Sequence, residues 1–231
     1  MALYTIGDTH LSLGTDKPMD VFGGGWTGYV EKLEAGWRAV GPEDTVVICG
    51  DISWGMSLEE AAPDFAFLDR LPGARKLLLK GNHDYWWATA AKMKRFFEAE
   101  GFTTLDILHN NSHRYGTVAL CGTRGWFYEE DQRPGGHNEK IFRRELQRLE
   151  TSLKAGGPGP KICFLHYPPC YQGYTCEEII GLMEAYGVER CFYGHLHSGG
   201  CRLALEGRRG QIEYRLVSAD HLAFQPQKIL D

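Results

Sequence analysis

The stretch ALYTIGDTH, residues 2–10, places two metal-binding side chains, Asp8 and His10, directly after a short apolar run. An apolar run of this length is typical of a buried β-strand. Three more segments repeat the arrangement of an apolar run followed by oxygen and nitrogen donors: Gly50-Asp51, Gly81-Asn82-His83-Asp84 and Gly194-His195-Leu196-His197. His166 follows one further apolar run. The repetition indicates where strands end and where polar side chains gather.

Short apolar runs alternate along the chain with segments that have the helical period. The apolar runs are residues 2–6, 45–49, 76–79, 117–121, 161–165 and 190–193, and the helical segments are residues 27–40, 57–71, 86–100, 139–153 and 176–186. This alternation predicts parallel strands with helices on both faces. Near the end, residues 200–205 and 211–217 flank a glycine-containing turn at residues 206–210, which predicts an antiparallel hairpin. We therefore expect an α/β layered sandwich of mixed β-sheets flanked by helices, built as a single domain of residues 1–231.

Local signals mark several of the expected helix ends. Ser57 followed by Glu60 is a capping box, which satisfies backbone N–H groups at a helix start. Gly101 and Gly187 are predicted to end the helices before them, because glycine readily adopts the left-handed conformation of a C-cap. Asp84 is a possible N-cap for the helix expected over residues 86–100.

Composition and charge limit the class of protein and of partner. The chain has 231 residues, of which 43% are hydrophobic and 24% charged, as in an ordinary globular protein with one buried core. Its formal net charge of -5 gives no electrostatic reason to bind nucleic acid. Metal ions would supply local positive charge that this sum omits, so small phosphorylated molecules are the expected partners. The oligomeric state stays open.

Cysteine usage and hydropathy bear on the compartment. The seven cysteines are odd in number and form no C-x-x-C pair, and several lie inside apolar runs as small hydrophobic side chains. A reduced, cytoplasmic protein is therefore expected rather than a disulfide framework. No secretory signal is expected, because the first residues run straight into the first motif, and no apolar run approaches the ~20 residues that span a membrane.

The placement of the donors predicts a metal site. In α/β sheets, ligands gather at the carboxyl ends of the strands, and every donor segment follows an expected strand directly. Asp, Asn and His side chains suit Mn²⁺, Fe or Zn²⁺. The donors outnumber what one divalent ion needs, and they correspond to two ions that share a carboxylate. The residues alone thus indicate a two-metal hydrolase.

In this order, the motifs D-x-H, G-D, G-N-H-D, a separate His and G-H-x-H resemble those of the calcineurin-like metallophosphoesterase superfamily. The resemblance extends from Asp8 to His197 and implies the family's layered fold and a dinuclear metal site. Carried over motif by motif, it implies Asp8, His10 and His197 as ligands of one ion. It implies Asn82, His166 and His195 as ligands of the other ion, with Asp51 bridging both.

The same resemblance implies the chemistry. A water or hydroxide that bridges the metals would attack phosphorus in line, and His83 would protonate the leaving group as general acid. Asp84 would orient His83 and raise its pKa. A histidine suits this role because its ordinary pKa of about 6.5 lies near working pH.

The substrate is less well marked. Arg124, after the run at residues 117–121, would grip a phosphate bidentately or else form a surface ion pair. Tyr85, Trp86 and Trp87 would wall a pocket or pack against the next helix, with packing favoured. The glycine-containing loop at residues 14–26 leaves directly from the first motif, and such loops often carry specificity.

One departure from the family pattern bears on specificity. Protein serine/threonine phosphatases carry a G-D-x-V-D-R-G segment, whereas residues 50–56 are GDISWGM, without the second Asp or the Arg. The segment also differs from the G-D-x-F-D of lipid A precursor pyrophosphatases, so the chain resembles the bacterial-type phosphoesterases more closely. A phosphodiesterase or phosphatase acting on a small phosphomonoester, phosphodiester or nucleotide is the leading hypothesis. A phosphoprotein phosphatase and a non-catalytic scaffold of the same fold are the alternatives.

Overall fold

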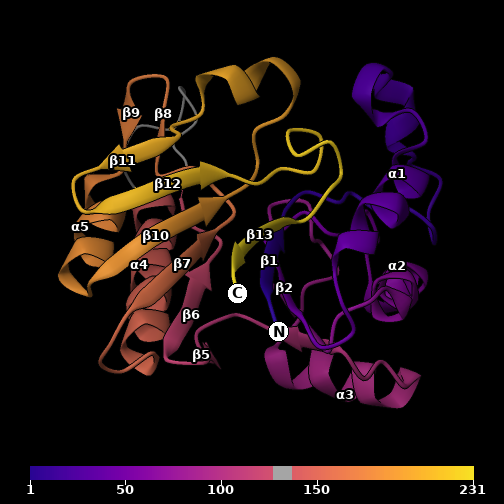
Figure 1. The fold of residues 1–231 in the computed structure, drawn as a ribbon, viewed down its shortest axis with the longest axis horizontal. Helices are drawn as coiled ribbons and strands as arrows, with labels where there is room; N and C mark the ends of the chain where they lie inside the picture. Colours follow the sequence, from indigo (N-terminus) through magenta and orange to yellow (C-terminus); the bar gives the residue numbers. More distant parts are fainter. Residues whose placement is uncertain (127–136) are drawn as a thin grey trace.

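Two β-sheets lie face to face at the centre of the molecule in a computed structural model, which describes residues 1–126 and 137–231 (Figure 1). The strand order is β13-β1-β2-β3-β4 in the first sheet and β11-β12-β10-β7-β6-β5 in the second. The strands of the first sheet are β1 Leu3–Ile6, β2 Thr45–Ile48, β3 Arg75–Leu78, β4 Leu105–Ile107 and β13 Gln227–Leu230. The strands of the second are β5 Ser112–Tyr115, β6 Val118–Thr123, β7 Lys161–Leu165, β10 Val188–Tyr193, β11 Gly207–Arg209 and β12 Ile212–Leu216. A short separate hairpin pairs β8 Cys170–Tyr171 with β9 Tyr174–Thr175.

Both sheets are mixed, as the sequence predicts. Strands β1 to β4 run parallel, and β13 pairs with β1 in the antiparallel direction. In the second sheet β6, β7, β10 and β12 are parallel, whereas β5 and β11 are antiparallel edge strands. The carboxyl ends of the parallel strands of each sheet therefore share one edge, where ligand-binding loops are expected.

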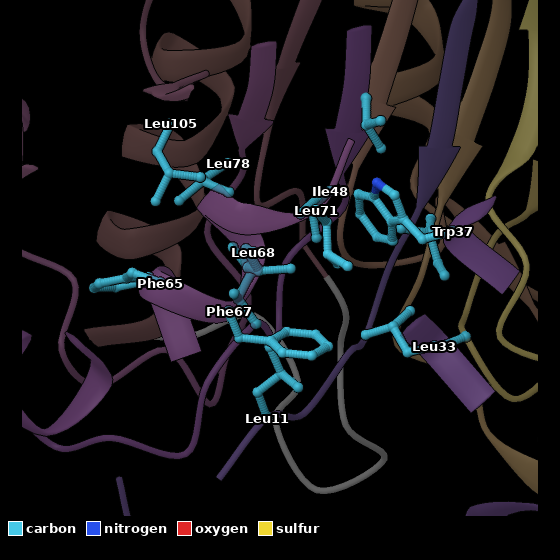
Figure 2. Close-up of a cluster of buried hydrophobic side chains, with 14 of the residues drawn as sticks. Leu11, Leu33, Trp37, Ile48, Phe65, Phe67, Leu68, Leu71, Leu78 and Leu105 are labelled. Atoms are coloured by element: carbon cyan, nitrogen blue, oxygen red, sulfur yellow. The ribbon is translucent and has the colours of Figure 1, made fainter. Parts of the chain in front are cut away.

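Helices cover the outer faces of the two sheets, which gives four layers (Figure 1). The α-helices are α1 Tyr29–Gly36, α2 Leu58–Arg70, α3 Ala90–Glu100, α4 His137–Ala155 and α5 Glu177–Ala185. Helices α1, α2 and α3 lie beside the first sheet, and Figure 2 shows Leu33 and Phe65 in one buried cluster with Ile48 and Leu78. Helices α4 and α5 cover the second sheet, where Leu149 lies in the corresponding cluster. None of the described helices combines the length and the apolar character that crossing a bilayer requires.

The apolar core between the sheets is built from the strands themselves. Leu3, Val47 and Leu77 of the first sheet share a buried cluster with Phe164 and Phe192 of the second. The two phenylalanine rings stack with centroids 5.7 Å apart. Because these strands are buried on both faces, they carry nearly continuous apolar runs, and this is why the sequence reveals them.

Several helix boundaries differ from the expected ones. The Ser57 hydroxyl accepts from Glu60 N, as the capping box predicts, but the Glu60 carboxylate accepts from Met56 N rather than from Ser57. Helix α3 begins only at Ala90, because the Thr89 side chain caps it by accepting from Lys92 N. The expected helix start at residue 86 and the N-cap role of Asp84 are therefore wrong.

The hairpin near the C-terminus is tighter than expected. Residues 198–203 form a 3-10 helix, so the strand predicted over residues 200–205 is wrong. Strand β11 lies inside the expected turn, and its Arg209 pairs with Ile212 of β12. Only two residues then connect the strands, and Gly210 supplies the positive φ of 60° that such a short turn requires.

Candidate metal centre

The loops that carry the predicted metal-binding residues meet at one edge of the two sheets. They follow β1, β2 and β3 of the first sheet and β7 and β10 of the second. Backbone hydrogen bonds join them: Asp8 N donates to Gly50 O over 2.9 Å, and Gly194 N donates to His166 O over 3.1 Å. Gly7 N donates to Val217 O over 2.6 Å, which links the end of β1 to the end of β12 across the two sheets. The site thus has a shared backbone frame.

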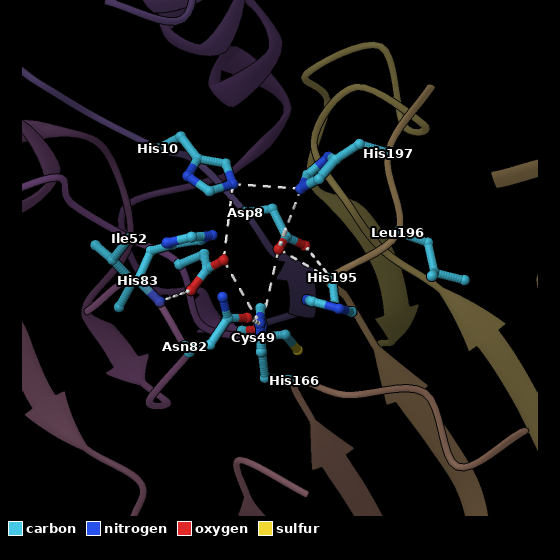
Figure 3. Close-up of polar contacts among 12 residues, drawn as sticks. Asp8, His10, Cys49, Ile52, Asn82, His83, His166, His195, Leu196 and His197 are labelled. Carbon is cyan, nitrogen blue, oxygen red and sulfur yellow. Dashed lines mark hydrogen bonds and ion pairs between the residues drawn. The ribbon is translucent and has the colours of Figure 1, made fainter. Parts of the chain in front are cut away.

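A first group of donors consists of Asp8, His10 and His197, whose ligand atoms lie within 4.8 Å of one another. The Nε2 atoms of His10 and His197 are 3.2 Å apart. His197 Nε2 lies 3.6 Å from Asp8 Oδ1. Figure 3 shows the three side chains pointing toward a common point. Residues that are far apart in the sequence therefore lie close enough together to bind one metal ion.

A second group consists of Asp51, His166 and His195, again within 4.8 Å of one another. The Asn82 amide joins this group, since its Oδ1 lies 2.6 Å from His166 Nε2. Asp51 lies between the two groups: its Oδ2 is 3.5 Å from His166 Nε2 and 3.8 Å from His10 Nε2. A carboxylate in this position can bridge two ions, as the resemblance implies.

Neighbouring groups fix which nitrogen two of the histidines, His166 and His197, present to the site. Nδ1 of His166 lies 3.1 Å from the carbonyl oxygen of Cys49 and so donates to it, which leaves the Nε2 lone pair facing the site. Nδ1 of His197 lies 3.0 Å from Asp220 Oδ1. Asp220 was not among the residues predicted from the sequence. Its signal was its position shortly after β12, at the same strand-end edge as the ligands.

The backbone at the site is held in an uncommon conformation. Asp8, His10, Asp51 and His195 have φ values of 56°, 45°, 48° and 73°, in the left-handed region that residues other than glycine rarely adopt. Such conformations cost free energy and gather at functional sites.

Glycines make room for the carboxylates. A Cβ at Gly81 would collide with Asp51 Oδ1, and one at Gly194 would collide with Asp8 Oδ2. The glycine in the G-N-H-D and G-H-x-H motifs is therefore a steric requirement of the site.

The electrostatics of the site suit cations. Burial lowers the pKa of His10, His166 and His195 to about 3 each, so these imidazoles are neutral and keep a lone pair. Burial raises the pKa of Asp8 to about 8, with a smaller contribution from the nearby Asp51 carboxylate and against the opposing effect of His197. Neutral imidazoles and carboxylates are the donor forms that divalent metals bind, so these residues fit two such ions.

His83 and Asp84 do not contact each other in the expected way. The buried Asp84 carboxylate accepts from Ile52 N over 2.8 Å, Gly81 N over 2.7 Å and Trp86 Nε1 over 3.1 Å. The His83 backbone N–H donates to Asp51 Oδ1 over 2.8 Å, while His83 Nδ1 has no hydrogen-bond partner among the described residues. Asp84 therefore joins the loops after β2 and β3. The expectation that it orients His83 directly is wrong.

Arg124 lies next to the second group. Its backbone oxygen accepts from His166 N over 3.1 Å, and its guanidinium stands 5.8 Å from the centre of the Tyr167 ring. Its Nη2 is 3.8 Å from the carboxylate of the buried Glu145. Arg124 thus forms an ion pair, but with a buried glutamate rather than at the surface as the alternative expected, and its phosphate-binding role stays a prediction.

A cavity of about 330 Å³ opens beside the two groups. Half of its lining consists of site residues: His10, Asp51, His83, His195 and His197. The rest consists of Met19, Phe22 and Trp26 from the loop at residues 14–26, together with Trp54 and Ser198. Of the aromatic residues after the acid motif, Trp86 packs in the core against Phe65, with ring centroids 4.8 Å apart, whereas Tyr85 is exposed.

Comparison with known proteins agrees with this geometry. Residues 1–199 match the family model described as calcineurin-like phosphoesterase. No curated protein matches the chain. A solved structure of the protein of unknown function AQ665 from Aquifex aeolicus is similar at 16% identity and a TM-score of 0.52, over 98% of this chain and 95% of that one. The structure of TT1561 from Thermus thermophilus aligns at 13% identity and a TM-score of 0.49, over 84% and 81%. At such identity the likeness to AQ665 concerns the fold alone.

Proposed function

Because the chain belongs to the calcineurin-like phosphoesterase family, we propose that it hydrolyses a small phosphoester with two divalent ions bound at the sheet edge. The substrate class comprises phosphomonoesters, phosphodiesters and nucleotides. One observation carries the proposal: two convergent groups of buried donors meet at the single carboxylate of Asp51. A site for one ion would not need the second group, and a purely structural polar cluster would not line a cavity.

The site residues have different roles in the proposed reaction. Bound ions would lower the pKa of a water molecule and neutralise charge that develops on the phosphoryl oxygens. Asp51, Asn82 and the histidines would bind the ions, and the backbone of the loops already holds these side chains in place. His83 lines the cavity beside Asp51, and no described residue hydrogen-bonds to its ring. Its ring proton would pass to the leaving-group oxygen as the bond from that oxygen to phosphorus breaks.

The sequence and the structure also support proposals for the metal, the kind of substrate and the cellular compartment. The Asp, Asn and His donors suit Mn²⁺, Fe or Zn²⁺, and availability decides among these as much as geometry does. The net charge of -5 supports a small substrate rather than a nucleic acid. All seven cysteines carry free thiols, which supports a reducing compartment such as the cytoplasm.

A parallel assay tests the proposal. Protein loaded with Mn²⁺, with its metal content measured, is given an aryl phosphomonoester and the matching aryl phosphodiester. We expect hydrolysis of at least one ester and loss of that activity after chelation. Hydrolysis of the monoester alone would support a phosphate-gripping role for Arg124. If protein that holds two ions hydrolyses neither ester, the proposal is wrong.

A further inference from the structure

The cavity beside the metal-binding groups has an apolar, aromatic wall. Met19, Phe22, Trp26 and Trp54 line it together with the site residues. Three of these four side chains are aromatic, and they come from two loops, one leaving His10 and the other leaving Asp51. A phosphoryl group bound at the ions would therefore place the rest of its molecule against rings.

The tryptophan rings of the cavity contact the metal-binding histidines and the proposed acid. Trp54 stacks on His10 with ring centroids 5.1 Å apart and 24° between the planes, and its centroid lies 4.6 Å from that of His83. Trp26 packs edge-on against His10 at 5.8 Å and against His197 at 5.6 Å. Since His83 would protonate the leaving-group oxygen, the atoms attached to that oxygen lie nearest to Trp54.

Exposed apolar side chains follow several of the metal-binding motifs along the chain. Among the described residues, the strongly exposed large hydrophobic side chains other than Met1 all follow a metal-binding motif: Leu13, Val21, Phe22, Met56, Tyr85 and Leu203. Phe22 is 70% exposed although it lines the cavity. An exposed aromatic ring that also lines a cavity is available to contact a bound ligand.

We propose that the cavity binds the organic part of the substrate, and that this part carries a planar aromatic ring close to the ester oxygen. The inference rests on the proposed hydrolysis and narrows its substrate class. A volume of about 330 Å³ lies at the small end of ligand pockets, so it suits one ring system rather than a polymer. Rings are favoured over aliphatic chains because aromatic side chains stack with other rings face to face or edge to face.

Three esters whose alcohols have similar acidity test the ring directly. Benzyl, cyclohexylmethyl and ethyl phosphate, or their methyl diesters if diesters are the class hydrolysed, differ in the organic group while the leaving-group chemistry is matched. We expect the KM of the benzyl ester to be roughly threefold to tenfold below that of the cyclohexylmethyl ester, which is the effect of one aromatic pair. The ethyl ester should have the highest KM. Equal KM values, or a lower KM for the cyclohexylmethyl ester, would overturn the inference.

A pair of neighbouring variants locates the effect. Phe22→Leu keeps an apolar side chain and removes the ring, so the KM of the benzyl ester should rise about threefold while that of the ethyl ester stays constant. Val21→Ala is the control, because Val21 is 77% exposed and does not line the cavity. Equal effects of the two variants would overturn the inference. Absence of turnover for all esters in metal-loaded protein would instead count against the proposed hydrolysis.

Discussion

The two donor groups use the same chemistry in different surroundings. His197, in the first group, is 27% exposed in its side chain and is held by the carboxylate of Asp220. His166, in the second group, is fully buried and is held by the backbone carbonyl of Cys49. The aromatic wall contacts His10 and His197, whereas the second group lies against Tyr167, whose ring centroid is 4.6 Å from that of His195.

The two groups differ in their neighbours rather than in their burial. Each group has two buried members and one half-buried histidine, and each contributes to the cavity lining: His10 and His197 from the first group, Asp51 and His195 from the second. The rings of Trp26 and Trp54 contact the histidines of the first group, so the organic part of a substrate would lie on that side. Asp51 belongs to both groups, and changes on either side test how far the two are independent.

The largest expected effect comes from removing the shared charge. Asp51→Asn should lower activity by about a thousandfold and weaken both ions, because a bridging carboxylate contributes several kcal/mol to holding and using them. Steady-state rates and metal analysis measure this. Asp16→Asn makes the same chemical change at an exposed position and should leave both quantities unchanged. Loss of only one ion in Asp51→Asn would show that Asp51 does not bridge.

His83→Ala should reduce turnover by about 10²–10⁴-fold while both ions stay bound, because it removes a general acid and no ligand. The loss should be smaller for a 4-nitrophenyl ester than for a benzyl ester, since a good leaving group needs no proton. Rates and metal content for both esters provide the measurement. Unchanged turnover would favour the scaffold alternative or another acid, and loss of metal would make His83 a ligand.

Asp220→Asn should weaken the ion at the first group by about 10–100-fold and leave the second ion in place, because it alters the group that orients His197. Calorimetric titration of metal-free protein resolves the two binding steps. Asp106→Asn is a matched control, since Asp106 also lies beside a histidine, His113 at 3.8 Å, which belongs to neither donor group. Equal weakening of both ions would show that the groups are not independent.

A smaller effect concerns stability. Asp64, buried in α2, accepts from Leu13 N over 2.7 Å and from Ser53 Oγ over 2.5 Å, which ties together the loops that leave His10 and Asp51. Burial raises the pKa of Asp64 to about 6, against the opposing effect of these hydrogen bonds. The folded state therefore holds this proton more tightly than the unfolded state. The stabilisation is complete below about pH 4 and is lost as pH rises to about 6.

We expect Asp64→Asn to reduce this pH dependence. The free energy of unfolding of the variant, relative to that of the wild type, should rise by up to about 3 kcal/mol between pH 4 and pH 7. Urea unfolding of metal-free protein at several pH values measures the difference. A difference that is constant with pH would show that Asp64 titrates normally.

Burial decides how much of the fold the sequence predicts. The run at residues 161–165 coincides with β7, because a strand covered on both faces is apolar throughout. The edge strands β5, with sequence SHRY, and β13, with sequence QKIL, were missed, because their side chains are largely half-buried or exposed. Their pairing depends on the neighbouring strand rather than on their own composition.

The same distinction applies to the site. Each motif residue follows its own strand, so local sequence was enough to gather all of them at one edge. Asp220 reaches His197 across 23 residues with no fixed spacing, and the loop paths alone bring Trp26 and Trp54 to His10. The direct contact expected between Asp84 and His83 is absent, because the Asp84 carboxylate instead accepts hydrogen bonds from backbone N–H groups of two loops.

Electron paramagnetic resonance of protein loaded with two equivalents of Mn²⁺ tests the central claim most directly. If Asp51 bridges two ions ~3.5–4 Å apart, the spectrum will be that of an exchange-coupled pair, and Asp51→Asn will abolish the coupling. Saturation at one equivalent, or a spectrum of two isolated Mn²⁺ ions in the wild type, would contradict the dinuclear site.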